Sequence, residues 1–294
     1  MRRLNIAHVT EYWFPTSVTL LPHRLRIRPL ESHSLRIESS KLDITPAHSV
    51  RWYHDVLGNS VALVSFSELS NALRVLSEVV IVVYEDPPLD CMLENFAISC
   101  PFDYAIDEQP DLAPFRQSVY PADRAVLHKW LDELGLLVRP IETFSLLFQL
   151  NCGIANHFTY QIREEEGVQS PAQTLKRNSG SCRDFAALFI EACRYMGLAS
   201  RFVSGYLHMA DNEAGNATTH AWAEVYLPGP GWKGFDPTSG LITGNQHIPV
   251  AVARHPEAVP PVSGSFIGPL GQRPALSVSV RVSDLGLDGV NLPA

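Results

Sequence analysis

The chain has 294 residues, of which 46% are hydrophobic and 18% are charged, and its formal net charge is −8. This composition is typical of a folded globular protein and excludes a disordered or fibrous chain. With 31 acidic against 23 basic residues, the chain lacks the cationic surface that nucleic acid binding requires. The length predicts two domains, each large enough to bury its own core.

The cysteine content indicates free thiols. An odd number of cysteines in a chain of this size argues against a disulfide framework, and no pair has the two-residue gap of zinc or redox motifs. No apolar run is long enough to span a bilayer, and the alternation behind Met1 is typical of a strand and not of a signal peptide. We therefore expect a reducing, cytoplasmic location, no membrane association, no metal and no cofactor. The five cysteines are Cys91, Cys100, Cys152, Cys182 and Cys193.

The first part of the chain has the period-two alternation of half-buried strands. Turn-forming residues separate these runs, and Pro87-Pro88 follows the last of them. Short strands at this spacing predict a β-sandwich-like N-terminal domain, which we place at residues 1–105. The predicted strands begin around Leu4, Leu25, Leu35, Val61 and Val79.

Residues 106–294 combine helices with later strands, which predicts an α+β domain. Apolar spacing predicts helices over Ala122–Leu134, Thr143–Phe158 and Cys182–Met196, the last ended by Gly197. Strands are expected at 201–207, 221–227, 231–235 and 276–282. The segment 242–267 is rich in Pro and Gly, so we expect it to form long surface loops.

Cys182 is a candidate nucleophile because of its position. It follows Gly180-Ser181 and opens the most convincing helix. The unpaired N–H groups and partial positive charge at a helix N-terminus favour a thiolate over a thiol.

A base and an orienting acid are expected on two neighbouring strands. His220 opens one strand and Asp236 ends the next, and the turn at 228–231 would place them side by side. Cys182, His220 and Asp236 would then be the nucleophile, base and orienting acid of acyl transfer. Each residue alone has a simpler interpretation: a packed cysteine, a hydrogen-bonded histidine and an Asp-Pro turn. Their combination in this order favours catalysis.

These residues resemble the core of bacterial transglutaminase-like proteins. Further positions resemble the β-rich N-terminal region that accompanies this core in the same proteins, so the resemblance covers nearly the whole chain. The core segments are 180–186, 203–206, 219–226 and 231–238, and the N-terminal positions are His8, Tyr12, Arg24–Pro29 and Asp55–Asn59.

The resemblance implies a papain-like cysteine-hydrolase core. Cys182 would attack a carboxamide or peptide carbonyl, His220 would carry the proton and Asp236 would orient His220. Relatives commonly have a Gly-Arg-Asp segment in a late loop, where this chain has Ala253-Arg254-His255-Pro256. This departure concerns the substrate-side loop and leaves the three candidate residues intact.

Three further residues are candidates for supporting roles. Tyr160 lies where this superfamily often places an aromatic, and it is a candidate beside the Cys182 N–H for the oxyanion site, although simple packing is an equal explanation. Asp184 suits the helix dipole, so a structural role is its first explanation, with an influence on substrate access as the second. Trp222 is expected to pack beneath the candidate triad.

The sequence therefore predicts a cysteine-dependent acyl-transfer enzyme acting on a protein or peptide. Hydrolysis is our first expectation because water is always available to an exposed acyl-enzyme, whereas transamidation needs a site that excludes water and holds an amine. The alternatives are a protein-glutamine amine transferase and a catalytically silent binding or scaffold protein. The sequence does not determine the oligomeric state.

Overall fold

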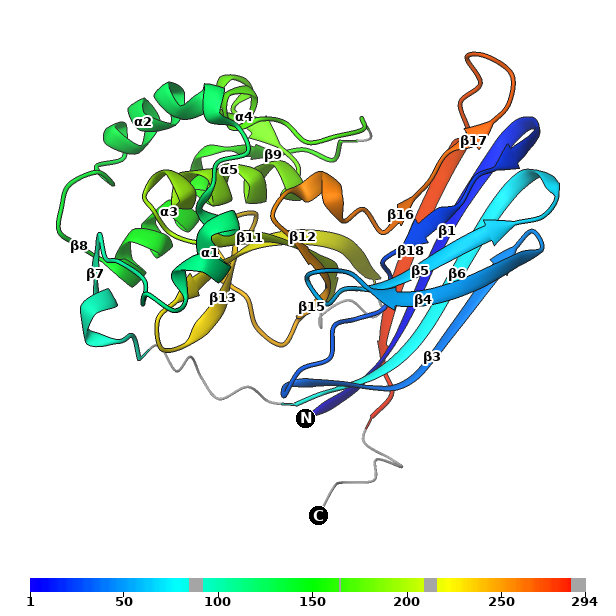
Figure 1. Cartoon of the computed structure of the whole chain (residues 1–294), viewed down its shortest axis with the longest axis horizontal. Helices are drawn as coiled ribbons and strands as arrows, with labels where there is room; N and C mark the ends of the chain where they lie inside the picture. The colour runs from blue at the N-terminus through cyan, green and yellow to red at the C-terminus, as the bar shows by residue number, and fades with distance from the viewer. Residues whose placement is uncertain (85–91, 164, 209–215, 287–294) are drawn as a thin grey trace.

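The computed structural model describes residues 1–84, 92–163, 165–208 and 216–286. Its N-terminal part is built of strands alone (Figure 1). These strands are β1 (Arg2–Leu20), β2 (His23–Leu25), β3 (Leu35–Thr45), β4 (His48–His54), β5 (Ser60–Phe66) and β6 (Leu69–Val83).

The following part contains all the α-helices among the described residues. The helices are η1 (Asn95–Ala97), α1 (Gln109–Arg116), η2 (Pro121–Asp123), α2 (Arg124–Glu133), α3 (Thr143–His157), α4 (Pro171–Arg177), α5 (Cys182–Tyr195) and η3 (Pro256–Ala258). The strands are β7 (Ser99–Cys100), β8 (Ile141–Glu142), β9 (Thr159–Tyr160), β10 (Ser179–Gly180), β11 (Ser200–His208), β12 (Asn216–Leu227), β13 (Gly231–Asp236), β14 (Leu241–Ile242), β15 (His247–Ala253), β16 (Val262–Ser263), β17 (Phe266–Ile267) and β18 (Ala275–Asp284).

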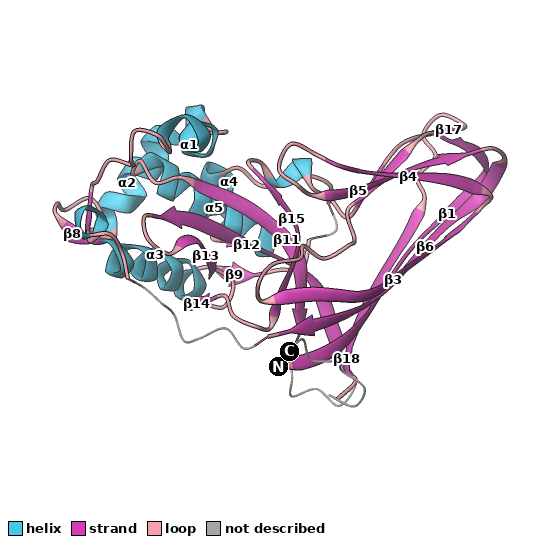
Figure 2. Cartoon of the chain, turned by 60° about the horizontal axis from the view of Figure 1, so that its bottom comes forward, coloured by secondary structure: helices cyan, strands magenta, loops and turns pink. Residues whose placement is uncertain are grey.

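One large antiparallel sheet runs through both parts of the molecule (Figure 2). Its order is β14-β13-β12-β18-β1-β6-β3, and β11 and β15 extend it from β12. A second sheet of order β16-β2-β5-β4 faces the N-terminal strands. Apolar side chains of both sheets meet between them, among them Phe14, Leu25, Val64 and Leu73. This arrangement is the predicted β-sandwich-like fold.

The helical core packs around α5. Its residues Phe185, Leu188 and Phe189 are buried against side chains of α2, α3 and the strands β12 and β13. Gly197 follows the helix with φ of 88°, a left-handed conformation that glycine adopts without strain and that ends the helix where the sequence predicts. Helices on an antiparallel sheet confirm the predicted α+β class.

The C-terminal strands of the chain pair with strands of the N-terminal part. The expected strand at 276–282 is present as β18, but it pairs along β1 from Leu4↔Asp284 to Trp13↔Ala275. β16 and β17 pair with β2 and β1. The last strands of the chain therefore complete the N-terminal sheets.

The prediction of long surface loops over 242–267 is wrong for its middle part. Residues His247–Ala253 form β15, which pairs with β11 and is largely buried. Pro249 lies opposite Gly205, next to a register shift in this pairing. A bulge is a position at which a strand tolerates proline, so the residue that suggested a loop lies inside a strand. No helix among the described residues is long and apolar enough to span a bilayer.

Candidate active site

Cys182 is the first residue of α5, as the sequence predicts. Ser181 caps the helix in a capping box with Asp184, whose side chain accepts hydrogen bonds from the Ser181 N–H and hydroxyl at 2.8 Å each. Gly180 precedes the cap because a Cβ at this position would lie 2.9 Å from the Asp184 Cβ. The approach to Cys182 is thus fixed by packing and capping together.

His220 lies on β12, opposite Gly205 of β11. Gly205 leaves room for Trp222, because a Cβ there would overlap its ring and the Ile248 carbonyl oxygen. His220 is 7% exposed, so its imidazole is held within the site.

Asp236 ends β13, and the β12–β13 hairpin brings it beside His220 as expected. His220 Nε2 lies 2.9 Å from Asp236 Oδ2. The Thr238 N–H donates to Oδ1 at 2.9 Å and the Ser239 hydroxyl donates to Oδ2 at 3.0 Å. These donors fix the carboxylate in a buried position.

The electrostatics of the pair favour charge on both groups. Burial alone would lower the pKa of His220, but hydrogen bonds to Asp236 and Cys182 and the charges of these two groups raise it to about 9. Burial would raise the pKa of Asp236, but hydrogen bonds from His220 and His247 hold it far below its usual range. At neutral pH the site therefore contains an imidazolium hydrogen-bonded to a carboxylate.

Cys182 and His220 line one cavity of about 610 Å³. Its floor is formed by residues of β11 and β12, and the segments 166–168 and 256–261 form its walls. The lining residues are Glu166, Gly167, Val168, Cys182, Arg183, Phe202, Ser204, Thr219, His220, Ala221, Pro256, Glu257, Val259, Pro260 and Pro261. This volume is within the range of small-ligand sites.

Comparison with known proteins identifies the family. The family model described as the transglutaminase-like superfamily matches residues 143–237, which include Cys182, His220 and Asp236. The model of the bacterial transglutaminase-like N-terminal region matches residues 4–82. The chain belongs to the transglutaminase-like superfamily. The resemblance seen in the sequence is confirmed for both parts of the chain.

Relatives match this transglutaminase-like chain either over nearly its whole length or over part of it. An uncharacterized protein of Mycobacterium tuberculosis is 29% identical over 298 residues, which cover 95% of this chain and 92% of that protein. An uncharacterized protein of Mycobacterium leprae is 36% identical over 107 residues, or 35% of this chain and 38% of that protein. The crystal structure of a candidate cysteine protease from Cytophaga hutchinsonii covers 100% of this chain and 94% of its own, with a TM-score of 0.72 and 20% identity. This structural likeness shows a shared fold.

His247 is a site residue that the sequence reasoning missed. Its Nε2 lies 3.3 Å from Asp236 Oδ2, and its Nδ1 accepts the Gly244 N–H at 3.4 Å. Acceptance at Nδ1 leaves the proton of the neutral ring on Nε2, which then donates to Asp236. His247 opens β15, in the segment that we expected to be a loop, so no pattern marked it as part of the site.

His220, Asp236 and His247 are also the residues in the described part of the chain that could hold a metal ion. Their ligand atoms lie within 4.8 Å of one another. Both histidines already direct Nε2 at the same carboxylate oxygen, so a metal here would compete with the hydrogen bonds of the transglutaminase-like site.

The three supporting residues have different surroundings. Asp184 is fully buried, and besides its capping bonds it pairs with Arg163 at 2.7 Å and accepts the Gln169 N–H at 2.8 Å. It therefore ties the residues on both sides of the cavity wall 166–168 to the start of α5. Trp222 is buried, with its ring centroid 6.3 Å from that of His220 and 5.2 Å from that of His247.

Tyr160 is half exposed and packs edge-on against Phe185 with ring centroids 6.4 Å apart. Partial burial, followed by the charges of Cys182 and Asp236, raises its pKa. Its hydroxyl is therefore protonated at neutral pH and within electrostatic reach of the site.

The other cysteines in the described residues have packing environments. Cys100 and Cys193 are buried, Cys152 is half-buried with its Sγ 3.5 Å from the Gly240 carbonyl oxygen, and all are free like Cys182. Cys91 lies outside the described residues. Cys152 is thus a natural reference thiol of comparable exposure.

Proposed function

We propose that the chain is a cysteine-dependent hydrolase that cleaves peptide or amide bonds of a protein or peptide substrate. The observation that carries this proposal is the position of His220, which is hydrogen-bonded to Asp236 and lines the same cavity as Cys182, whose interaction with the imidazole helps to raise the His220 pKa. This is the arrangement of nucleophile, base and orienting acid that acyl transfer requires.

In the first half of the reaction, the Cys182 thiolate attacks the substrate carbonyl carbon. A C–S bond forms and the carbonyl oxygen takes the negative charge, which the Cys182 backbone N–H and the Tyr160 hydroxyl would stabilise. The His220 imidazolium then gives its proton to the leaving nitrogen, the C–N bond breaks, and a thioester remains. Asp236 keeps the imidazole oriented through both steps.

In the second half, His220 removes a proton from water while the water oxygen attacks the thioester. The C–S bond breaks, a carboxylic acid leaves and Cys182 is regenerated with the imidazolium beside it. If a primary amine attacks in place of water, the product is a new amide. We propose hydrolysis because water is always available to an exposed acyl-enzyme, whereas transamidation needs a site that excludes water and holds an amine.

The activated nucleophile is tested by alkylation. Iodoacetamide at neutral pH should label Cys182 far faster than the reference thiol Cys152 and the remaining three cysteines, as measured by peptide mass mapping over time. The His220→Ala variant should slow labelling of Cys182 and leave Cys152 unchanged. Equal rates at all five cysteines would overturn the proposal and favour a scaffold without catalytic activity.

A hydrolase and an amine transferase are distinguished by the products that they form from a glutamine-containing peptide. A library of glutamine-containing peptides is incubated with the protein, with and without a primary amine, and analysed by mass spectrometry. Cleaved or deamidated peptides support hydrolysis, whereas an amine adduct that depends on Cys182 would replace hydrolysis by transamidation. Trapping the acyl-enzyme from a cell lysate would then identify the acyl group of the substrate.

A further inference from the structure

A segment to which the proposed mechanism assigns no role forms one wall of the cavity. Residues 255–260, here called the roof segment, include Pro256, Glu257, Val259 and Pro260, all of which line the cavity with Cys182. The role of the roof segment follows from its contacts in this chain.

Both ends of the roof segment are anchored to rigid elements. Before it, the Arg254 carbonyl oxygen accepts a hydrogen bond from Arg194 Nη2 at 2.7 Å. After it, the Pro261 carbonyl oxygen accepts the Arg26 N–H at 2.8 Å, and β16 pairs with β2. The anchors belong to the nucleophile helix on one side and to the N-terminal sheets on the other.

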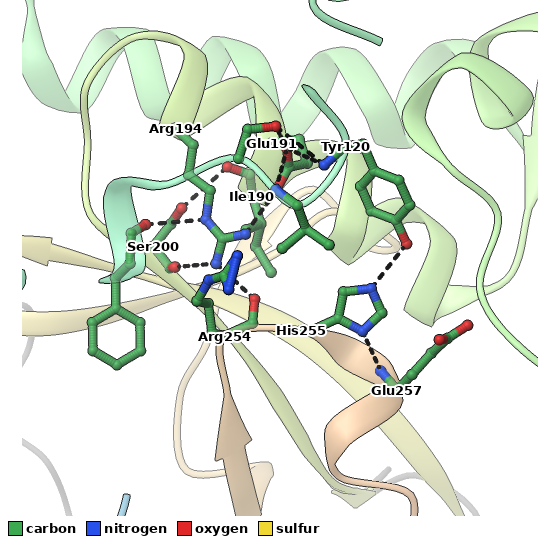
Figure 3. Close-up of polar contacts among 11 residues, drawn as sticks. Tyr120, Ile190, Glu191, Arg194, Ser200, Arg254, His255 and Glu257 are labelled. Atoms are coloured by element: carbon green, nitrogen blue, oxygen red, sulfur yellow. Dashed lines mark hydrogen bonds and ion pairs between the residues drawn. The ribbon is translucent and has the colours of Figure 1, made fainter. Parts of the chain in front are cut away.

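The anchor on α5 is a buried ion pair (Figure 3). Arg194 and Glu191 lie 2.7 Å apart, with side chains 1% and 2% exposed. Their remaining hydrogen-bonding groups hold other segments: Arg194 donates to the carbonyls of Phe115 and Ser200, and Glu191 accepts from the backbone N–H of Val119 and Tyr120. A buried pair with these partners fixes residues 115–120 and residue 254 relative to α5.

Between its anchors, the roof segment is held by side chains. Tyr120 Oη lies 3.3 Å from His255 Nε2, with ring centroids 5.8 Å apart. His255 Nδ1 accepts the Glu257 N–H at 3.1 Å and so caps η3. Because Nδ1 is an acceptor, the ring proton is on Nε2, which donates to the tyrosine oxygen.

Glu257 joins the roof segment to the cavity wall formed by residues 166–168. Glu257 Oε1 accepts the Val168 N–H at 3.3 Å, and Val168 lines the cavity. Burial, opposed by the charge of Glu257, lowers the pKa of His255, so the ring stays neutral at neutral pH and can both accept from Glu257 and donate to Tyr120.

We propose that Tyr120 and His255 are positioning residues that latch the roof segment over the cavity and thereby determine how tightly a bulky acyl group binds. The proposal rests on the proposed function, in which the cavity receives that acyl group. Neither residue lies among those that line the cavity, so the latch acts on binding through Pro256, Glu257 and Val259 and leaves the chemistry at Cys182 unchanged.

The test compares a large and a small thiol reagent. Benzyloxycarbonyl-phenylalanyl chloromethyl ketone must enter the cavity before the Cys182 sulfur displaces its chloride, whereas iodoacetamide needs little of the cavity. Inactivation rates over a range of ketone concentrations give the half-saturating concentration and the limiting rate. In Tyr120→Phe, loss of one hydrogen bond should raise the half-saturating concentration about 3- to 10-fold, with the limiting rate and the iodoacetamide rate unchanged.

The chain offers matched controls. His255→Asn keeps an oxygen that can cap η3 but does not reach Tyr120. Its half-saturating ketone concentration should therefore rise as much as that of Tyr120→Phe. The double variant should show no larger rise than either single variant, because both changes remove the same hydrogen bond. Tyr195→Phe removes a similar hydroxyl, which lies 2.7 Å from His128 Nδ1 on the helices outside the cavity, and should change nothing. An unchanged half-saturating concentration in Tyr120→Phe, or an equal rise in Tyr195→Phe, would overturn the proposal, as would a parallel loss of the iodoacetamide rate.

Hydrogen exchange separates the failure of the latch from the failure of the proposed function. The amides of residues 255, 257, 258 and 259 should exchange faster in Tyr120→Phe than in the wild type, whether or not the protein is catalytic. Unchanged exchange would overturn the latch even if Cys182 is reactive. Resistance of the wild-type Cys182 to iodoacetamide, together with faster exchange in the variant, would overturn the catalytic proposal and support the latch as a structural contact.

Discussion

The transglutaminase-like core and the N-terminal β region bury different kinds of polar side chain. In the core, the buried polar groups include four charged residues, Asp184, Glu191, Arg194 and Asp236. In residues 1–84 they are His8, Thr10, His23, Asn59 and Ser77, and burial lowers the pKa of both histidines. Burying a charge is costly unless it is paired. Each of these four charged side chains has a partner of opposite charge, and the pairs fix the segments around the site.

Two histidines show what decides the difference. His8 and His220 are both buried, and each is hydrogen-bonded on both sides. His8 contacts the Tyr206 hydroxyl at 2.8 Å and the Thr10 hydroxyl at 2.9 Å, and burial lowers its pKa to about 4. His220 contacts Asp236, and its pKa is raised to about 9. Burial makes a histidine neutral, and a carboxylate partner reverses this effect.

The largest expected effect is on the stability of the core. Glu191→Gln keeps the size of the side chain but leaves the buried Arg194 charge unpaired, so the free energy of unfolding should fall by about 3 to 5 kcal/mol. The matched change in the N-terminal region is Glu38→Gln, whose carboxylate lies 2.6 Å from Arg3 but is 26% exposed, and it should cost less than about 1 kcal/mol. Urea denaturation measures both, and similar losses would remove the distinction between the regions.

The next effect concerns the charge on His220. Asp236→Asn removes the carboxylate that raises its pKa, so the pKa should fall toward the ordinary value of histidine. Activity should drop about 100-fold or more. In the pH profile of Cys182 alkylation, the change that reports loss of the His220 proton should move to lower pH. An alkylation profile that keeps its wild-type position in Asp236→Asn would show that the carboxylate does not control the imidazole.

His8 and His220 should make the free energy of unfolding depend on pH in opposite directions. The folded His8 pKa of about 4 is below its ordinary 6.5, so between these values the unfolded chain binds a proton that the folded chain does not. Stability from neutral His8 is therefore lost as pH falls, by about 2 kcal/mol between pH 7 and pH 5. His220 has a raised pKa, so its contribution is lost as pH rises through about 9.

His8→Gln isolates the first of these contributions. Glutamine does not titrate, so the variant should lose less stability than the wild type between pH 7 and pH 5, as measured by urea denaturation at each pH. Parallel stability curves for the two proteins would mean that His8 protonates equally in the folded and unfolded states.

The sequence predicted Cys182, His220 and Asp236 as a group because Cys182 and Asp236 stand at element boundaries and His220 precedes a clear strand pattern. The expectation that His220 opens its strand is wrong, because β12 begins at Asn216 and His220 lies inside it. Cys182 follows a Gly-Ser helix start, and the other two residues flank a hairpin. His247 was missed because β15 contains Pro249 and resembles a loop. The edge position of β15, which among the described strands pairs with β11 alone, and the register shift beside Gly205 make this proline compatible with pairing. A local pattern does not contain that information.

The same limit applies to the strands. Period-two alternation identified the strand at 276–282, but alternation shows which side chains share a face and not which strand is the partner. The pairing of β18 with β1, on the edge opposite β6, depends on the fold of the whole chain. For this reason the sequence does not reveal that the last strands of the chain pair with β1 and β2.

The smallest effect tests one of the contacts between the N-terminal region and the core. Asn59 is buried, and its side chain both donates to the Val252 carbonyl and accepts the Val252 N–H at 2.8 Å, so it pairs with β15 as a neighbouring strand would. Asn59→Ala leaves these backbone groups without that partner and should cost about 1 to 2 kcal/mol. The adjacent Ser60→Ala, which removes only a 3.5 Å contact with His54, should cost less than about 0.5 kcal/mol. Because β15 carries His247, Asn59→Ala should also slow Cys182 alkylation severalfold. A variant as stable and as reactive as Ser60→Ala would show that a neutral contact from the N-terminal region does not support the charged site.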